Sequence, residues 1–427
     1  MSFELILFWL FVIAGLFNLA HIGFYLAGAN LYDIKAFKLK AKNQKTRKKL
    51  PLISIVFATF NAEKVIARTL ESLTKLKYPN YEVIVVDNGS ADSTRKLIRS
   101  FIKEHPKFSL RLIGKKQNVG KALAINYGAK NYAKGEFVMT LDDDSVLHPN
   151  ALRNVVRYFD DPNVAGVAAN VRIIEEPSVL SILQMLEHLI SYRSKKTFTV
   201  TNCELIVGGV ASTYRHNLLK KIGYYDTGTM TEDIGLSMKI TALGNKQHKL
   251  VYAADVVAAT EGVDTFKGLL KQRFRWKYGC LQNIIRYKNM LGNSDKKYSR
   301  MLTHYRMPMA FIGEVMLLLE PLLIGYMLYL SYSLQSVELI IGSYALITAY
   351  LLLNVMPDEH TTLKQRLRLA LYAPFAYFIF YIMNLVQISA AINCLLKGKS
   401  LINQTPHSGT WRSPDRRGNT AMVFNKA

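Results

Sequence analysis

The chain has 427 residues, of which 50% are hydrophobic and 20% are charged, and its formal net charge is +24. The length exceeds that of one average domain and the hydrophobic share is high for a soluble protein, so membrane segments are expected. The three cysteines, Cys203, Cys280 and Cys394, lack the spacing of metal ligands, which agrees with a reducing compartment and argues against a disulfide framework.

Residues 1–30 are predicted to form an N-terminal transmembrane helix. The stretch 3–29 is apolar except for Glu4, Asn18 and His21, and as a helix it is long enough to cross a bilayer. It lacks a basic leader and is longer than a typical signal-peptide core, which favours a retained anchor. Residues 31–50 form a basic linker, and basic flanks mark the cytoplasmic side. Because the positive charge lies beside apolar segments, the lipid bilayer is the expected partner and nucleic acid is not.

Residues 51–290 change to a pattern of strands alternating with helices, which predicts a parallel sheet. In open α/β sheets, ligands bind beyond the carboxyl ends of the strands, and Asp87 follows the second expected strand. By itself, Asp87 is equally explained as part of a helix cap. Further along, Gly120 permits a close backbone approach and Lys121 could reach a phosphate or a base, although a solvated lysine would look the same.

Three consecutive carboxylates, Asp142, Asp143 and Asp144, end the third clear strand. If the extended path continues through them, Asp142 and Asp144 share one side and Asp143 points away. Two hard oxygen donors on one side suit Mg²⁺ or Mn²⁺ that carries a phosphate. A solvated acidic turn is the alternative, because runs of charge usually lie at the surface.

Two later helices carry polar residues of chemical interest. In Thr231-Glu232-Asp233, the threonine fits a helix N-cap and Asp233 is a carboxylate that could take a proton from a hydroxyl. The second helix holds Gln272, Arg275 and Trp276, where the guanidinium suits a diphosphate and the indole suits an interface.

Two helices, at about residues 178–197 and 265–287, are predicted to lie at the membrane interface because they combine apolar faces with basic or aromatic residues. Beyond them, the region 300–400 is predicted to be membrane-embedded, with helices over residues 307–332, 339–356 and 371–396.

Among the polar residues within these apolar segments are Glu314, Glu320 and Asn384. They would be costly against lipid, so we expect them to face other helices or a polar passage. Counting the spans places the tail, residues 401–427, outside the cell, whereas its basic charge places it inside. A broken or interfacial helix would resolve this conflict.

In chain order, Asp87, Asp142-x-Asp144, Thr231-Glu232-Asp233 and Gln272-x-x-Arg275-Trp276, with apolar flanks, resemble glycosyltransferase family 2. Within that family the chain looks like the processive membrane synthases of poly-N-acetylglucosamine, hyaluronan, chitin oligosaccharides and cellulose. The resemblance covers about residues 51–287 by motif. It implies an α/β fold of the GT-A type, Rossmann-like with a mostly parallel sheet, in a cytosolic domain inserted between transmembrane helices of the plasma membrane.

The resemblance also implies a role for each motif residue. The nucleotide of a UDP-sugar would be held by Thr59, Asp87, Lys121 and Asp142. Asp144 would bind the Mg²⁺ or Mn²⁺ that bridges the diphosphate, and Asp143 has no implied role. Asp233, next to Glu232, looks like the catalytic base, while Gln272, Arg275 and Trp276 look like the segment that holds the diphosphate and the acceptor sugar.

One motif departs from the family. The first strand commonly ends in Pro-x-Tyr-Asn-Glu there, whereas this chain has Ala58-Thr59-Phe60-Asn61-Ala62. The nucleotide contact usually given by that glutamate is therefore absent or passes to Glu63.

The function implied is an inverting transfer that elongates a β-linked polysaccharide from a UDP-sugar, with UDP-N-acetylglucosamine preferred, and whether the product is also translocated is left open. The expected partners are the donor, the growing glycan and the bilayer, with an accessory membrane subunit or a second copy of the chain as further candidates. Two alternatives remain. One is a non-processive transferase that adds a single sugar to a lipid carrier, and the other is an inactive membrane scaffold or glycan-binding protein.

Overall fold

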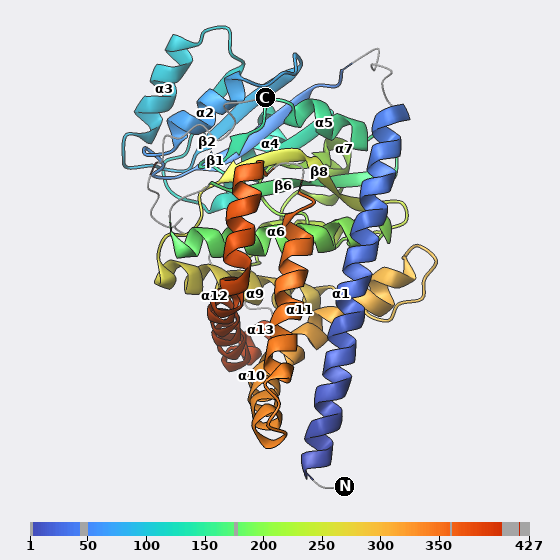
Figure 1. Cartoon of the computed structure of the whole chain (residues 1–427). Coiled ribbons are helices and arrows are strands. Elements are labelled where there is room, and N and C mark those ends of the chain that lie inside the picture. Colours follow the sequence, from blue (N-terminus) through green and yellow to red (C-terminus); the bar gives the residue numbers. More distant parts are fainter. Residues whose placement is uncertain (1–2, 43–49, 175–177, 359–360, 404–417, 419–427) are drawn as a thin grey trace.

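The computed structural model describes residues 3–42, 50–174, 178–358, 361–403 and 418. A sheet with its covering helices occupies one end of the molecule and long helices occupy the other (Figure 1). Between these two parts lie α6 (Val179–Val200) and α9 (Phe266–Arg286), the two helices that the sequence predicts at a membrane interface.

The sheet has eight strands in the order β3-β2-β1-β4-β7-β6-β8-β5. The strands are β1 (Ile53–Thr59), β2 (Tyr81–Asp87), β3 (Leu110–Gly114), β4 (Phe137–Thr140), β5 (Val146–Leu147), β6 (Val164–Ile173), β7 (Ser212–Arg215) and β8 (Lys249–Thr260). Strands β1 to β4 pair in parallel, as do β6 and β8. Strand β7, however, runs antiparallel to both β4 and β6, and β5 runs antiparallel to β8.

The predicted mostly parallel sheet is therefore mixed: β1 to β4 and the β6–β8 pair follow the prediction, whereas β7 and β5 do not. The reason lies in the path of the chain. After α6, which lies beyond the carboxyl end of β4, the chain enters β7 with Ser212 opposite Thr140, the last residue of β4. A strand that starts at this edge has to run back against β4.

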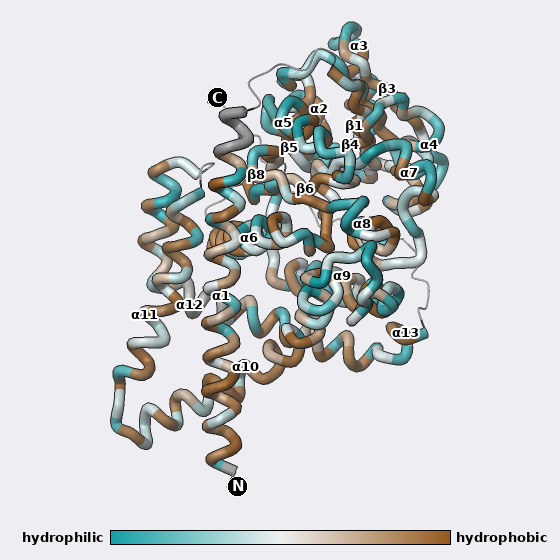
Figure 2. The backbone as a smooth tube through the Cα atoms, turned by 90° about the vertical axis from the view of Figure 1, so that its right-hand side faces the viewer, coloured by the Kyte–Doolittle hydropathy of each residue, from teal (hydrophilic) through white to brown (hydrophobic). Residues whose placement is uncertain are grey.

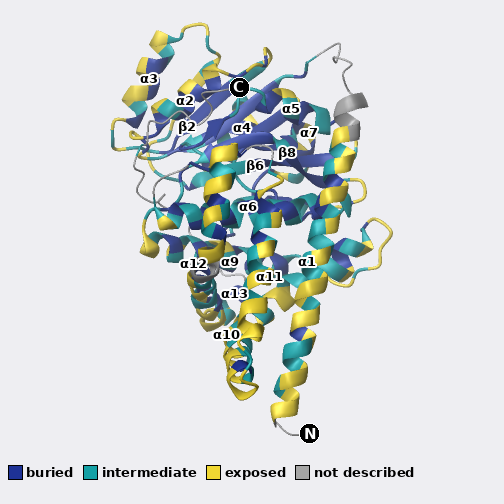
Figure 3. Ribbon diagram, in the orientation of Figure 1, coloured by how far each residue is buried: buried dark blue, intermediate teal, exposed yellow. Residues whose placement is uncertain are grey.

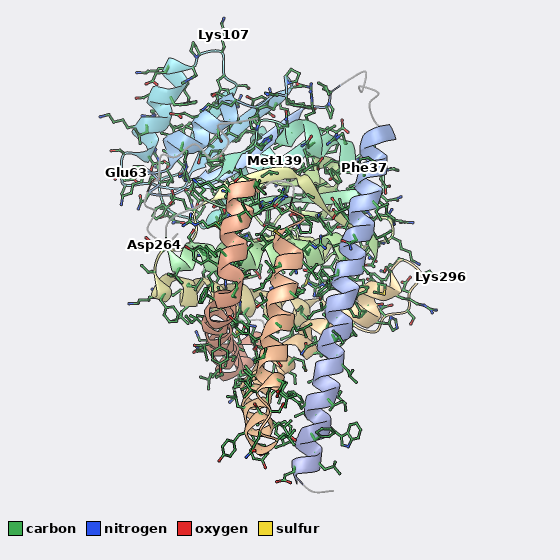
Figure 4. All side chains as sticks on the ribbon, viewed as in Figure 1. Phe37, Glu63, Lys107, Met139, Asp264 and Lys296 are labelled. Carbon is green, nitrogen blue, oxygen red and sulfur yellow. The ribbon has the colours of Figure 1, made fainter. Side chains whose placement is uncertain are left out.

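Helices pack on both faces of the sheet: α2 (Ile66–Thr74), α3 (Thr94–Glu104), α4 (Lys121–Tyr132), α5 (Ala151–Tyr158), α7 (His216–Ile222) and α8 (Glu232–Ala242). Successive β1 residues point to opposite faces. Ile55 and Phe57 join a core with α2, α3 and α5, whereas Val56 joins a second core with α4 and α8. The central strands are buried, as the dark blue strands in Figure 3 show, whereas β3 at the edge of the sheet is partly exposed. Met139 of β4, fully buried, is labelled within this sheet in Figure 4.

Among the described residues, three helical stretches are long and apolar enough to cross a membrane: Glu4–Phe37, Met301–Ser333 and Glu338–Val355. They belong to α1 (Phe3–Lys42), to a π-helical turn (Met301–Arg306) continued by α10 (Met307–Ser333), and to α11 (Glu338–Val355). Apolar residues colour these helices brown in Figure 2. Helix α1 continues past residue 30 to Lys42, so much of the predicted linker 31–50 is helical, and residues 43–49 lie outside the described residues.

The predicted span 371–396 takes a different course. It belongs to α12 (Leu363–Leu396), which contains Pro374 and is followed by the short α13 (Gly398–Ile402). Met383 and Val386 pack with Leu269 near the start of α9, and Cys394 packs with Tyr278 further along it. The second half of α12 thus runs beside α9. Pro374 removes one backbone hydrogen bond, but α12 continues as one helix to Leu396.

Polar residues of the apolar helices pair with other helices, as predicted. Asn384 of α12 donates a hydrogen bond to Glu320 of α10 (2.7 Å), and Lys277 of α9 forms an ion pair with Glu314 (2.6 Å). A 3₁₀ turn, Lys288–Met290, follows α9.

Most of the predicted basic tail lies outside the described residues, but Gly418 lies against the backbone of Lys64. A side-chain carbon on Gly418 would stand 2.6 Å from the Lys64 carbonyl oxygen. Gly418 therefore lies against the α/β domain.

Candidate active site

A cavity of about 530 Å³ opens between the sheet and helices α6, α8 and α9. It lies beyond the carboxyl ends of β1 and β4, where ligands of open α/β sheets bind. The predicted site residues on its wall are Thr59, Lys121, Asp142, Glu232, Asp233, Gln272, Arg275 and Trp276. The structure thus brings together residues that are up to 217 positions apart in the sequence, from Thr59 to Trp276. The two other predicted site residues, Asp87 and Asp144, are fully buried behind this wall.

Lys121 stands among acidic groups at the start of α4. Its Nζ atom lies 2.6 Å from Oδ1 of Asp142 and 3.5 Å from Oε1 of Glu232. The preceding Gly120 has a φ of +92°, in the region that favours glycine, and turns the chain into the helix. Burial alone would lower the pKa of Lys121, but the carboxylates of Asp142 and Glu232 outweigh it and raise that pKa. Lys121 is therefore a permanent cation on the cavity wall.

Asp233 lies in the first turn of α8 and faces the same cavity. Its Oδ1 accepts a hydrogen bond from the backbone N–H of Ile234 (2.9 Å). Burial, followed by the charge of Glu232, raises the pKa of Asp233 to about 6, against the opposing effect of Lys121. A carboxyl group with this pKa is ionised near neutral pH and still basic enough to accept a proton from an attacking hydroxyl.

The Thr231-Glu232-Asp233 segment is held in place by α9. Asn283 of α9 donates to Oγ1 of Thr229 (2.8 Å) and to the carbonyl of Thr231 (3.3 Å). Gly279 lets the two helices approach, since a Cβ there would stand 2.6 Å from Cγ2 of Thr231. Helix α9 therefore positions Asp233 as well as carrying its own motif.

The acidic run does not continue as a strand. A turn forms instead, closed by a hydrogen bond from the Ser145 N–H to the Asp142 carbonyl (3.1 Å). Asp142 and Asp143 both line the cavity, and Asp143 also accepts from the Phe60 N–H (3.3 Å). The expectation that Asp142 and Asp144 share a side is therefore wrong, because a turn lacks the two-residue alternation of a strand.

Asp144 is fully buried directly behind the wall. Its Oδ1 accepts hydrogen bonds from the hydroxyls of Ser145 (3.1 Å) and Thr260 (3.0 Å), and Thr260 itself lines the cavity. Asp144, the predicted metal ligand, is therefore connected to the cavity wall by its hydrogen bond from Thr260.

Asp87 does not line the cavity, as a residue that binds the nucleobase would. Its carboxylate pairs with Arg95, 2.6 Å from Nε, and accepts from the Ser90 N–H (3.1 Å). The next residue, Asn88, lines the cavity together with Asn118, to which it donates a hydrogen bond of 2.9 Å. Sequence reasoning missed both asparagines, although the position of Asn88 directly after a strand was a usable signal.

A second feature that sequence reasoning missed is a polar stripe on α6. Its residues recur at helical spacing and line the cavity: Gln184, Glu187, His188, Ser191, Tyr192 and Lys195. The opposite face of α6 carries the apolar residues that the sequence highlights. There, Leu186 and Leu189 pack against α11 and α12. One helix therefore separates the cavity from the apolar helices.

On α9, Gln272, Arg275 and Trp276 face the cavity as predicted, with Trp276 36% exposed. Arg273 is buried behind them and forms an ion pair with Glu187 of α6. The guanidinium of Arg275 adds positive charge to the wall on which Asp233 lies.

The side chains of the cavity wall fit a divalent cation that is also coordinated by the phosphates of a bound substrate. Within the described residues, no group of three or more His, Cys, Asp or Glu side chains could hold a metal by itself. Mg²⁺ is typically bound by one or two carboxylates together with substrate phosphates, and Asp142 and Asp143 supply such carboxylates on the wall.

The fold is that of a GT-A-like α/β protein. A mannosyltransferase from Pyrobaculum calidifontis, PcManGT, solved in complex with GDP-Man and Mn²⁺, superposes with a TM-score of 0.59 over 90% of this chain and 99% of its own, at 22% identity. Residues 51–279 match the model of the family described as glycosyltransferase like family 2. The chain belongs to this family.

Among curated relatives, poly-beta-1,6-N-acetyl-D-glucosamine synthases from Staphylococcus epidermidis and Staphylococcus aureus are each 31% identical over 236 residues. The match covers 55% of this chain and 56% of each relative, so the chain spans just over half the length of the relatives it matches. The recognition of family 2 from the motifs is confirmed.

Proposed function

We propose that the protein is a membrane-embedded, inverting glycosyltransferase that elongates a β-linked polysaccharide from a UDP-sugar. The observation that carries the proposal is the gathering of a base, two permanent cations and an acidic turn around one cavity. These groups are Asp233, Lys121, Arg275 and the turn residues Asp142 and Asp143. The cavity lies next to helices that are apolar enough to cross a membrane.

Asp233 acts as the general base in this proposal. An acceptor hydroxyl attacks the anomeric carbon of the donor on the face opposite the diphosphate, and its proton passes to the Asp233 carboxylate. The bond from the anomeric carbon to the diphosphate oxygen breaks, and the electron pair leaves with UDP. A single displacement inverts the configuration at that carbon and needs no protein nucleophile.

The leaving diphosphate gains negative charge as the bond breaks, and positive groups on the wall stabilise it. Arg275 can offer two parallel N–H donors to phosphate oxygens, and Lys121 supplies a point charge. Asp144 remains the proposed metal ligand, and Asp142 and Asp143 are proposed beside it. A bound Mg²⁺ or Mn²⁺ supplies charge neutralisation of the diphosphate.

The nucleotide is proposed to lie at the β1 end of the cavity, between Thr59 and Lys121. Thr59 is buried on this wall, and its hydroxyl has no hydrogen-bond partner among the described residues, so a ligand can supply one. Asp87 is proposed to influence the nucleobase of the donor indirectly. Asn88, the next residue, lines the cavity and makes the contact in this proposal. Glu232 keeps Lys121 oriented and adds to the basicity of Asp233.

The membrane arrangement is proposed from three spans. If α1, α10 and α11 cross the bilayer and the second half of α12 lies along α9, the α/β domain, the basic connection 364–368 and the tail all share one side. Basic segments mark that side as cytoplasmic. Contact between Gly418 and Lys64 supports the same side for the tail.

The preferred donor is UDP-N-acetylglucosamine, because the matched relatives are named as synthases of poly-beta-1,6-N-acetyl-D-glucosamine. Membranes that contain the full chain should incorporate label from UDP-N-acetylglucosamine into an aqueous or insoluble polymer in the presence of Mg²⁺ or Mn²⁺. Label that moves into an organic phase would instead indicate one sugar on a lipid carrier. Label incorporated only from other UDP-sugars would overturn the donor preference.

A further inference from the structure

Arg273 occupies an unusual place in α9. It lies between two cavity residues, Gln272 and Trp276, but its own side chain is only 1% exposed. Its guanidinium makes three different contacts. Nη1 donates a hydrogen bond to Oε1 of Gln272 (2.8 Å), the planar group lies 4.3 Å from the centre of the Trp276 ring, and Nη2 pairs with the Glu187 carboxylate of α6.

These contacts fix both neighbouring side chains. Because the Gln272 carbonyl oxygen accepts from Arg273, the amide N–H groups of Gln272 remain available to a ligand. A guanidinium near an aromatic ring holds the ring by cation–π attraction, and Trp276 still keeps 36% of its surface exposed. Arg273 therefore orients a hydrogen-bond donor and an aromatic surface, the two groups that suit a sugar ring.

Arg273 depends in turn on Glu187. A buried guanidinium is costly unless a carboxylate neutralises it, and removal of one member of such a pair leaves the other charge buried and uncompensated. Glu187 comes from α6, a helix whose other face packs against α11 and α12. The ion pair thus connects the cavity motif of α9 to the helix beside the apolar spans.

We propose that Glu187 is a positioning residue for the acceptor glycan: through Arg273 it holds Gln272 and Trp276 in the orientation that receives the acceptor sugar. This inference rests on the proposed function. Without the Glu187 charge, Arg273 turns toward the polar cavity and releases both side chains, whereas the nucleotide end of the cavity, around Thr59 and Lys121, keeps its contacts.

The test uses the full chain in membranes and varies acceptor and donor separately. Glu187→Gln keeps the shape and removes the charge. We expect it to raise the acceptor oligosaccharide KM about tenfold or more, because small displacements of positioning groups cost this much, and to leave the UDP-N-acetylglucosamine KM within about twofold. The matched control, Asp226→Asn, removes the carboxylate of a different ion pair, with Lys239 (2.7 Å), and should change neither value.

A double-mutant cycle separates positioning from direct contact with the glycan. Because Glu187 acts through Arg273, Glu187→Gln, Arg273→Gln and the double variant should show similar acceptor KM values. If Glu187 binds the glycan itself, the double variant will be worse than either single variant, which would overturn the proposal. An unchanged acceptor KM in Glu187→Gln would also overturn it.

A structural readout covers the case in which Arg273→Gln does not fold. In a Trp9→Phe, Trp411→Phe background, Trp276 fluorescence should shift on Glu187→Gln and not on Asp226→Asn, and an unshifted spectrum contradicts the proposal. Absence of transfer by the wild-type chain from every UDP-sugar would instead overturn the proposed function, so the two failures are distinguishable.

Discussion

The Nζ atom of Lys121 lies 2.6 Å from Oδ1 of Asp142, and it is also within 3.5 Å of Oε1 of Glu232. This lysine therefore joins the acidic turn after β4 to the first turn of α8, where Asp233 lies. Its charge opposes the effects of burial and Glu232, which raise the pKa of Asp233. The acidic turn and Asp233 are therefore coupled through this one cation.

Lys121→Gln should move the acidic limb of the pH–rate profile to higher pH. Lys121 lowers the pKa of Asp233, so its removal raises that pKa, and a base with a raised pKa is ionised only at higher pH. The wild-type limb is expected near pH 6, from the Asp233 pKa of about 6. The measurement is kcat/KM for transfer between pH 5 and 9.

The control for this shift is Lys239→Gln, which removes a lysine whose partner is Asp226, outside the cavity wall. That variant should keep the wild-type limb. If the acidic limb of the pH–rate profile of Lys121→Gln is unchanged, or moves to lower pH, Lys121 does not lower the pKa of Asp233.

Asp143→Ala should be far from neutral, contrary to what alternation along a strand predicts. The Asp143 carboxylate lines the cavity and accepts the Phe60 N–H, so its loss removes both a candidate metal donor and a contact to the end of β1. We expect the Mn²⁺ concentration for half-maximal rate to rise about tenfold in Asp143→Ala. Asp144→Ala should be at least as severe.

The metal titration of the two variants separates the three acids. If Asp143→Ala keeps the wild-type Mn²⁺ dependence and Asp144→Ala has a strong defect, Asp144 binds the metal and Asp143 does not. The comparison is informative because the two side chains belong to the same turn and differ in burial.

Gly279→Ala should impair activity although Gly279 is distant from the acidic turn in sequence. A methyl group there would stand 2.6 Å from Cγ2 of Thr231, so α8 and the base have to move. Since misplacement of about 1 Å can cost about a hundredfold in rate, kcat should fall strongly while UDP affinity changes little. Gly313→Ala, at a position with open space around it, is the matched control. Equal kcat values in the two variants would show that α9 does not position Thr231-Glu232-Asp233.

The motif residues could be predicted from the sequence because chemistry at this site requires specific residue types at strand ends and helix starts. Lys121, Asp233 and Trp276 all reach the cavity as predicted. Helices α6 and α9 could also be predicted, since the period of their apolar residues reports the face that packs on other helices.

What could not be predicted depends on tertiary contacts. Asp87 follows a strand, as a ligand-binding residue would, but Arg95 of α3, eight residues further on, folds back and pairs with it. The turn at Asp142 depends on hydrogen bonds to β1 and α2, such as Thr69 to the Asp143 carbonyl (2.8 Å). Composition predicts a span in α12, and the packing of its second half on α9 is a tertiary contact that composition does not report. Polar residues of α6 at helical spacing were present in the sequence, and only the fold shows that they face a cavity.

The most direct test of the account is transfer by Asp233→Asn, measured together with UDP binding on the same purified full chain. The variant keeps the size of the side chain and the position of α8, and it removes only the proton acceptor. General bases contribute about 10²- to 10⁴-fold to rate, so transfer from UDP-N-acetylglucosamine should fall by that factor while the UDP dissociation constant stays within about twofold. Near-normal transfer by Asp233→Asn would contradict the assignment of the base, and with it the central claim.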